Sequence, residues 1–353
     1  MNVGILGVGS HLPETVRTND WWPKATVERW ESKTAQRAGS VEEHRTDGER
    51  RVIEAMQRQG GDPFKGAIER RVIADSDEPS DLETRAAEAA LSAAGIDRSE
   101  IDLLLGSSYC PDILAMPNAI IVHRKLGLSP RCFTTSIEAA CNSFLMQLEL
   151  AQQMIASGRA HHALLVQSSV ASRILRSDEP FSPWFGDGAT AVVVGRVSDG
   201  RGVIAASHRS DSSYGRTLVC GVSGKRWHDE GRAALFVEDR KAAHKMLLAV
   251  ADMGKETLDD CFAMSGTKPA DVGYFASHQA SIWFRTVCQD YIGMTNARAV
   301  DSFSWAGSLT GCNLPLVLDA GVKEGMLRSG DLVALYSGGT GVVYSGALVR
   351  WGR

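Results

Sequence analysis

Short apolar segments typical of buried strands alternate with amphipathic segments typical of helices along almost the whole chain. Residues 81–94 and 142–157 repeat apolar positions at helical spacing, whereas residues 101–106 are a short continuous apolar run. Strands alternating with helices are typical of α/β proteins, in which helices cover the faces of buried sheets. The sequence therefore predicts an α/β fold of two similar halves, residues 1–200 and residues 201–353.

The expected elements repeat in a similar style in the two halves. We expect strands at residues 3–8, 101–106, 132–136, 162–167, 189–195, 273–277, 331–336 and 342–351. We expect helices at residues 81–94, 118–126, 142–157, 241–258, 281–292 and 314–324. Residues 20–62 differ in character, because they are rich in charge and only loosely periodic, and we expect an insertion near residues 31–62. This segment is interpreted as a helical insertion with an exposed location.

Composition excludes several classes of protein. The 353 residues are 44% hydrophobic and 23% charged, with a net charge of -4, which argues against a basic nucleic-acid-binding protein. The seven cysteines form no C-x-x-C pair, so we expect reduced thiols, no metal site and no redox cofactor. The first residues lack a signal peptide, and no apolar run is long enough to span a membrane. We therefore expect a cytoplasmic protein without membrane or nucleic-acid partners.

Cys141 is the first candidate catalytic residue. It lies between an expected strand and the expected helix of residues 142–157. Unpaired backbone N–H groups and the helix dipole stabilise a thiolate at such a position. A buried structural cysteine is the alternative, and it is the usual state of the other six cysteines.

His278 is the second candidate, because it stands at the end of the apolar strand 273–277. Sites of α/β proteins gather at the carboxyl ends of strands, and a cysteine beside a histidine forms an activated nucleophile. The glycine-rich segment Ser337–Gly341 is predicted to form a turn between two strands. Its backbone N–H groups around Thr340, together with that of Cys141, are candidates for an oxyanion hole. A plain hairpin would have the same sequence features.

As an ordered set, these motifs resemble the ketoacyl-ACP synthase III family of the thiolase superfamily. The matching segments are residues 4–19, 138–158, 185–189, 277–280 and 307–351. The resemblance implies a five-layered αβαβα fold with two duplicated halves, and a homodimer. It also implies Cys141 as the nucleophile and His278 as the histidine of a Cys-His-Asn triad. The substrates would be thioesters of acyl carrier protein (ACP) or coenzyme A, with no bound cofactor.

The third member of the triad departs from the family pattern H-G-N-T-S. Counting back from Pro315 places Ser308 where asparagine is expected, and Asn313 falls at a helix position. The histidine and asparagine of the family together stabilise the enolate formed by decarboxylation of a malonyl thioester. Acyl transfer through Cys141 does not need that pair of donors. Ser308 is therefore expected to orient the histidine or the acceptor.

Other departures indicate a changed substrate. Trp283 stands where the family has an arginine that supports carrier docking, with Arg285 two residues later. The insertion disrupts the region that contacts coenzyme A in the family. Trp184, Trp305 and Asn313 are candidate substrate-binding residues, although packing explains the tryptophans equally well.

Three functions remain open. The first is an acyltransferase of natural-product (polyketide-type) biosynthesis, which moves an acyl or aryl group through Cys141 to a hydroxyl, amine or thiol acceptor on a small molecule or carrier. The second is a decarboxylating synthase, which forms a carbon–carbon bond with malonyl-ACP. The third is a non-catalytic partner subunit, against which the retained Cys141 and His278 argue.

Overall fold

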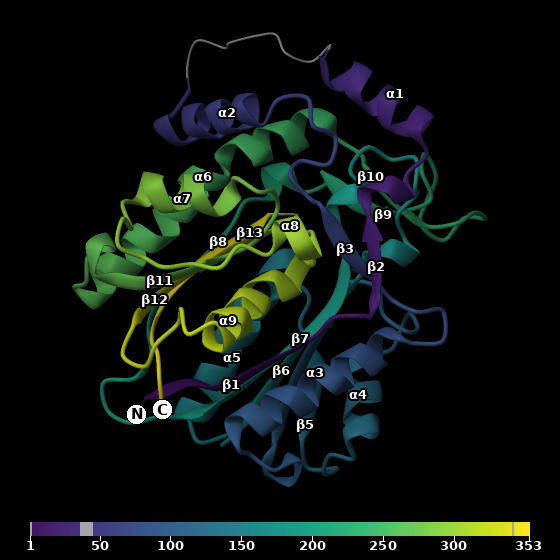
Figure 1. Ribbon diagram of the computed structural model, residues 1–353. Helices are drawn as coiled ribbons and strands as arrows, with labels where there is room; N and C mark the ends of the chain where they lie inside the picture. The colour runs from purple at the N-terminus through teal and green to yellow at the C-terminus, as the bar shows by residue number, and fades with distance from the viewer. Residues whose placement is uncertain (1, 36–44, 341) are drawn as a thin grey trace.

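The computed structural model describes residues 2–35, 45–340 and 342–353, and shows two sheets that sandwich a layer of helices (Figure 1). The first sheet has the strand order β1-β7-β6-β4-β5. Its strands are β1 (Val3–His11), β4 (Leu103–Ser108), β5 (Phe133–Ser136), β6 (Ala163–Val170) and β7 (Asp187–Arg196). β4 runs parallel to β5 and β6, whereas β7 runs antiparallel to β1 and β6.

The second sheet has the order β11-β12-β13-β8. Its strands are β8 (Gly202–Ser210), β11 (Val272–Ser277), β12 (Leu332–Gly339) and β13 (Val343–Arg350). β11 and β12 are parallel, and the other pairs are antiparallel. The chain passes from one sheet to the other between Arg196 and Gly202, close to the boundary predicted at residue 200.

Helices form three layers around these sheets. α5 (Ser143–Ala156) and α9 (Asn313–Lys323) share one apolar core with strands of both sheets and so lie between them. α3 (Pro79–Ala94) and α4 (Asn118–Leu126) pack on the outer face of the first sheet. α6 (Arg240–Ser265) and α7 (Phe284–Ile292) pack on the outer face of the second. The five layers confirm the predicted αβαβα fold.

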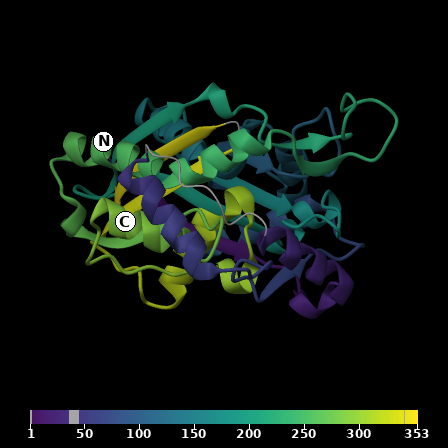
Figure 2. The same cartoon turned by 90° about the horizontal axis from the view of Figure 1, so that it is seen from above.

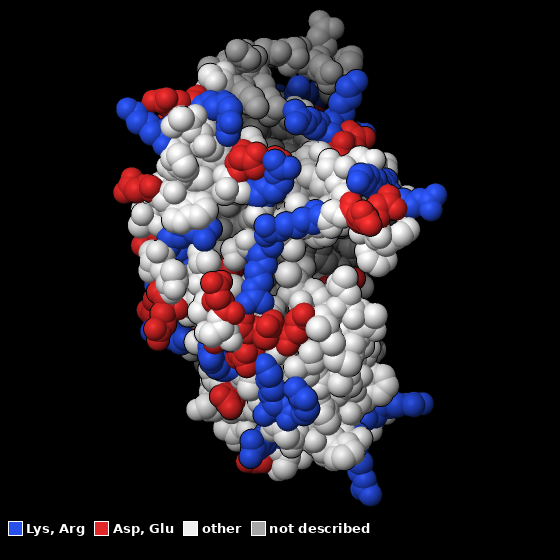
Figure 3. Space-filling model, turned by 90° about the vertical axis from the view of Figure 1, so that its right-hand side faces the viewer, with Lys and Arg blue, Asp and Glu red and all other residues white. Residues whose placement is uncertain are grey.

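The remaining elements lie at the periphery. They are α1 (Lys24–Ala35), α2 (Asp47–Gln59), α8 (Phe303–Ala306), β2 (Thr15–Thr18), β3 (Glu69–Val72), β9 (Leu218–Gly221) and β10 (Ala234–Val237). β2 pairs with β3, and β9 pairs with β10. No helix in the described ranges is long and apolar enough to cross a membrane. On the face that carries β2, β9 and β10, Figure 3 shows charges of both signs side by side.

The insertion is helical but less exposed than its charge suggests. Residues 36–44 lie outside the described residues, while α2 packs along α6 (Figure 2). Val52 and Ala55 face α6 and are buried because α2 is amphipathic. Trp30, on α1, is also buried. The expectation of an exposed segment is therefore wrong for the apolar faces of these helices.

Two further expectations need correction. The glycine-rich segment does not form a turn over its whole length, because Ser337–Gly339 continue β12 and pair with Val343–Ser345 of β13. Gly341, in the same segment, lies outside the described residues. The helix expected from Ser281 begins only at Phe284. Helix 118–126 has its expected ends, the other expected helices and strands are present with shifted ends, and helix 241–258 extends to Ser265.

Each half contains a 3-10 turn that leads into its central helix. Residues Ala140–Asn142 precede α5, and residues Thr310–Cys312 precede α9. Each turn starts at a non-glycine residue with positive φ, 49° at Ala140 and 50° at Thr310. Such residues are strained, and they persist only where the surroundings hold them. In this shared backbone pattern, Gly311 occupies the place of Cys141.

Candidate active site

Cys141 sits in the first of these turns, between the end of β5 and the start of α5. The hydroxyl of Ser143 helps to shape the turn, because it accepts a hydrogen bond from Ala139 N at 2.9 Å and donates one to the Ala140 carbonyl at 2.8 Å. The side chain of Asn142 points away and donates to Ser345 Oγ at 2.8 Å. The turn therefore presents the Cys141 thiol at the amino end of a central helix.

The second half of the chain holds this turn from the other side. The hydroxyl of Ser337, on β12, donates to the Cys141 carbonyl at 2.7 Å. Gly339 lies so close that a Cβ there would meet the Ala139 carbonyl oxygen at 2.2 Å. A Cβ at Gly311 would meet the Ala140 carbonyl oxygen at 3.1 Å. Cys141 is thus positioned by both halves of the fold.

His278 follows the last residue of β11 and meets the same two segments. Its backbone N–H donates to the Tyr336 carbonyl at 2.9 Å, which continues the pairing of β11 with β12. The backbone of Thr310, in the turn before α9, lies close enough to the imidazole to raise its pKa, and the ring meets that of Phe284 edge-on at 5.7 Å. The end of β12 and the turn before α9 therefore bring Cys141 and His278 to one place.

Burial sets the protonation states of this pair. It raises the pKa of the Cys141 thiol to about 12 and lowers the pKa of the His278 imidazole to about 4, although the Thr310 backbone favours the charged imidazole. The resting pair is therefore a neutral thiol and a neutral imidazole. The expectation that the helix terminus stabilises a thiolate is not met, because desolvation outweighs it.

Ser308 and Asn313 lie together, but the serine hydroxyl does not bond the histidine. Ser308 Oγ donates to Asn313 Oδ1 at 3.3 Å, and the same oxygen accepts from Leu309 N at 3.0 Å. The buried atoms that lack a hydrogen-bond partner in the described part of the chain include Nδ1 of His278 and Nδ2 of Asn313. Asn313 therefore has an unused donor group.

The two candidate tryptophans make local hydrogen bonds. Trp184 Nε1 donates to the Pro63 carbonyl at 2.8 Å, and the Trp184 carbonyl accepts from Ser308 N at 2.7 Å. Trp305 Nε1 donates to the Asp301 carbonyl at 3.0 Å. Trp184 thus links Pro63, just after the insertion, to Ser308. Trp305 instead makes its hydrogen bond to a residue that precedes α8, the short helix on which it lies.

Thr340 stands beyond the end of β12, one residue further along the chain than Gly339. Because Gly339 approaches the Ala139 carbonyl closely, its backbone N–H is a candidate oxyanion donor beside that of Thr340. The contact of the Ser337 hydroxyl with Cys141 was not predicted. Gly339 and Ser337 both belong to the glycine-rich segment, and the lack of a side chain at Gly339 was the signal that could have indicated this close approach.

Two further acidic residues were not singled out from the sequence, the exposed Glu138 and the buried Glu83. Glu138 accepts from Ser107 Oγ at 2.9 Å and from Ser108 N at 3.0 Å. Glu83 accepts from the Ser108 and Ser168 hydroxyls and from Asn118, and burial raises its pKa to about 7. No group of three His, Cys, Asp or Glu residues in the described ranges is placed to hold a metal ion.

Comparison with known proteins decides the family. The profile of 3-oxoacyl-[acyl-carrier-protein] synthase III matches residues 136–212, and the profile of its C-terminal part matches residues 262–351. The beta-ketoacyl-[acyl-carrier-protein] synthase III of Thiobacillus denitrificans is 32% identical over 290 residues, which cover 81% of this chain and 88% of the relative. The chain belongs to the beta-ketoacyl-ACP synthase III family.

Solved structures agree with this family at the level of the fold. The synthase III from Pseudomonas aeruginosa superposes with a TM-score of 0.80 at 23% identity, covering 100% of this chain and 99% of that one. The priming beta-ketosynthase from the R1128 polyketide pathway gives a TM-score of 0.80 at 24% identity, covering 99% and 96%. As a synthase III family member, the chain belongs among the thiolase-like condensing enzymes, which are transferases. Cys141 lies in the first matched segment and His278 in the second.

Proposed function

We propose that this family member is an acyltransferase of natural-product, polyketide-type biosynthesis. It takes an acyl or aryl group from an ACP or coenzyme A thioester onto Cys141 and passes it to a hydroxyl, amine or thiol. The observation that carries this proposal is the arrangement at Ser308. Cys141 and His278 are held at one place, while Ser308, at the family's asparagine position, turns its hydroxyl to Asn313.

The first half-reaction needs only the cysteine, the histidine and backbone donors. The neutral imidazole of His278 accepts the thiol proton as Sγ of Cys141 attacks the thioester carbonyl carbon. The N–H groups of Cys141 and Gly339, or of Thr340, stabilise the oxyanion. The carbon–sulfur bond of the donor then breaks, and the leaving thiolate takes the proton from His278. The products are acyl-Cys141 and a free carrier thiol.

The second half-reaction reverses this sequence with a new nucleophile. His278 accepts the proton of the acceptor hydroxyl, amine or thiol as it attacks the acyl carbon. The bond to Cys141 Sγ breaks, and the proton returns to the thiolate. A raised thiol pKa favours this return. The cycle is therefore ping-pong, and the imidazole is neutral at the start of each half.

A decarboxylating synthase is the second candidate, and one observation favours it. Asn313 Nδ2 is buried with no partner in the described residues, so it is a donor available to an enolate. It would replace the amide that the family carries at the position of Ser308. The two functions differ in one product, because only condensation releases carbon dioxide from a malonyl thioester.

The deciding experiment follows Cys141 by intact mass and measures carbon dioxide from malonyl-ACP. The acyltransferase proposal expects an acyl adduct on the wild type, none on Cys141→Ala, and no carbon dioxide above the Cys141→Ala background. Carbon dioxide release with a ketoacyl product overturns it in favour of the synthase. Absence of any acyl adduct with a panel of acyl-ACP and acyl-CoA donors indicates a non-catalytic subunit.

The carrier of the donor acyl group is ACP or coenzyme A. Arg285, the candidate replacement for the family's docking arginine, pairs with Asp301 through Nε at 2.8 Å and Nη2 at 2.7 Å. Trp283 carries no charge and Arg285 is already paired with Asp301, so neither residue offers a free cation at this place. The R1128 neighbour, described as a priming synthase, supports a polyketide setting. Comparing acylation by the same acyl group on ACP and on coenzyme A assigns the donor.

We propose a homodimer that forms along β5, one of the two edge strands of the first sheet. Exposed edges of sheets and contiguous apolar surface favour association. Large apolar side chains are exposed on β5 and in the segment before and within α4: Ile113, Leu114, Met116, Ile120 and Phe133. Light scattering should give twice the chain mass for the wild type and for Met264→Lys, a control on α6. Phe133→Lys should give a monomer, and an unchanged dimer would contradict this interface.

A further inference from the structure

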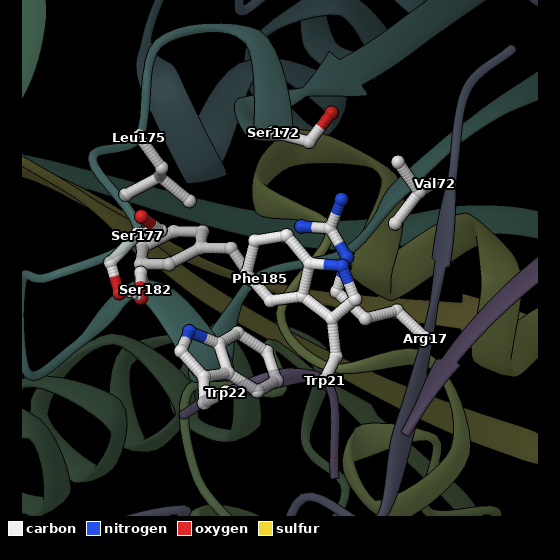
Figure 4. Close-up of a pocket in the computed structure, with 9 residues that line it drawn as sticks. All are labelled: Arg17, Trp21, Trp22, Val72, Ser172, Leu175, Ser177, Ser182 and Phe185. Atoms are coloured by element: carbon white, nitrogen blue, oxygen red, sulfur yellow. Dashed lines mark hydrogen bonds between the residues drawn. The ribbon is translucent and has the colours of Figure 1, made fainter. Parts of the chain in front are cut away.

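A separate pocket opens beside the candidate active site, and its lining combines a cation with aromatic rings (Figure 4). The empty volume of the pocket, including its open mouth, is about 450 Å³, which leaves room for one small ring. Three stretches of chain supply the lining. The residues that matter for its chemistry are Arg17, Trp21 and Trp22 from the first stretch, and Ser172 and Phe185 from the last.

The guanidinium of Arg17 is a cation without an acceptor. Its Cζ atom lies 3.8 Å from the centre of the Trp21 ring, and Figure 4 shows it between that ring and Ser172. Within the described ranges it makes no side-chain hydrogen bond or ion pair. The nearby carboxylate of Asp187 is already engaged by the N–H and hydroxyl of Ser172 and by the N–H of Ile73. Arg17 therefore retains its capacity to bind an anion.

A second arginine adds positive charge behind the aromatic wall. Arg70 is 1% exposed, and its Cζ atom lies 4.8 Å from the ring centre of Trp22. It donates to the carbonyls of Pro183 and Arg17 and to Asn19, while its Nη2 has no partner in the described residues. Burial of an unpaired arginine is costly, and an anion near Arg17 offsets part of that cost.

The lining defines the ligand's chemistry. A guanidinium binds a carboxylate through two parallel hydrogen bonds, and the indole and phenyl rings favour a flat apolar body. We propose that this pocket binds a planar aromatic carboxylate. The carboxylate would face Arg17, and the ring would pack against Trp21, Trp22 or Phe185.

The pocket is connected to the candidate active site through one residue. Phe185 lines the pocket and pairs with Ser308 in an isolated bridge. On either side of it, Trp184 O accepts from Ser308 N at 2.7 Å and Gly186 N donates to Ser308 O at 3.2 Å. We assign the carboxylate to the acyl acceptor, and this assignment rests on the proposed function. The nucleophilic group of the acceptor would reach past Phe185 towards Cys141.

Binding is tested by calorimetry on the full chain with benzoate, benzamide and inorganic phosphate. We expect benzoate to bind at least ten-fold more tightly than benzamide or phosphate. Arg17→Gln should remove this preference, Arg17→Lys should keep part of it, and Trp21→Ala should weaken benzoate binding. Arg159→Gln, an exposed arginine after α5, should behave as the wild type. Equal affinity for benzoate and benzamide, phosphate as tight as benzoate, or unchanged benzoate binding by Arg17→Gln each overturns the proposal.

The role of the ligand is tested separately from its binding. With acyl-Cys141 formed, transfer to 4-hydroxybenzoate should be at least ten-fold faster than transfer to 4-hydroxybenzamide. Arg17→Gln should abolish this preference, whereas the exposed-site control Arg159→Gln should keep both the preference and the rate of acyl-Cys141 formation. Equal rates overturn the acceptor assignment. If no acyl-enzyme forms but Arg17-dependent benzoate binding persists, the proposed function fails and the pocket stands.

Discussion

The Ser337 hydroxyl donates a 2.7 Å hydrogen bond to the carbonyl oxygen of Cys141, across 196 positions of sequence. This bond joins a strand of the second half to the nucleophile turn of the first. The residue before it, Tyr336, accepts from the backbone N–H of His278. Two consecutive residues of β12 therefore hold the backbones of Cys141 and His278.

Removing this bond should slow acylation more than it destabilises the protein. We expect Ser337→Ala to lose about 1 kcal/mol of unfolding free energy, the usual contribution of one hydrogen bond. We expect acyl-Cys141 to form roughly ten-fold more slowly, because the turn loses one of the contacts that orient the thiol. Quenching the reaction at set times and measuring intact mass gives the rate, and Ser265→Ala on α6 is the control. An unchanged acylation rate would show that the turn is held by other contacts.

Adding one methyl group at Gly339 should damage the site, whereas the same change at Gly338 should not. A Cβ at Gly339 would lie 2.2 Å from the Ala139 carbonyl oxygen, but one at Gly338 meets Tyr344 Cβ at an ordinary 3.5 Å. We expect Gly339→Ala to cost about 1–3 kcal/mol and most of the acylation rate. Urea unfolding and intact mass measure the two effects. Equal behaviour of the two variants would contradict the close approach.

His278 should make the protein less stable in acid. Its pKa of about 4 in the folded chain lies below the ordinary 6.5, so the unfolded chain binds the proton more readily. The stabilising contribution is present above pH 6.5 and is lost as the pH falls towards 4. It amounts to at most roughly 3 kcal/mol.

Urea unfolding at several pH values checks this assignment. Between pH 7 and pH 5, the wild type should lose more unfolding free energy than His278→Gln. His244→Gln, which changes an exposed histidine on α6, should follow the wild type. If His278→Gln loses as much stability as the wild type over this range, the imidazole is not held neutral by burial.

Glu83 should act in the opposite direction. Burial raises its pKa from 4.5 to about 7, so the folded chain holds this proton more tightly than the unfolded chain. Its stabilising contribution is present below pH 4.5 and is lost as the pH rises to 7. Relative to Glu83→Gln, the wild type should therefore lose up to roughly 3 kcal/mol between pH 5 and pH 8. Glu88→Gln, exposed on the same helix, is the control, and parallel pH profiles for wild type and Glu83→Gln would refute the assignment.

The order of strands and helices follows from the sequence because the spacing of apolar residues and the glycines that end helices are local signals. The helix of residues 118–126 was predicted with its observed ends, since Gly127 adopts the left-handed conformation that closes it. The strand character of Ser337–Gly339 was missed, because glycine-rich segments favour turns unless a partner strand holds them. Here β13 supplies that partner.

Cys141 and His278 could be singled out from the sequence, but the residues that hold them and their electrostatics could not. Cys141 and His278 stand out because each follows a strand and the flanking motifs resemble a known family. Their neutral states depend on burial by residues distant in sequence, which no local pattern reports. The pocket of Arg17 could not be predicted for the same reason, because Trp21 and Phe185 are far apart in the sequence and meet only in the folded chain.

The paired turns at Ala140 and Thr310 show how two similar halves come to differ in chemistry. Each half has the same backbone turn at the head of a central helix, and the two turns contact one another. At matching positions the first turn holds the thiol of Cys141, while the second has only the bare backbone of Gly311 against the Ala140 carbonyl. A Cβ at Gly311 would crowd that carbonyl oxygen at 3.1 Å. The symmetry of the two halves is thus kept in the backbone and lost in the side chains at this position, so only one half of the chain offers a candidate nucleophile there.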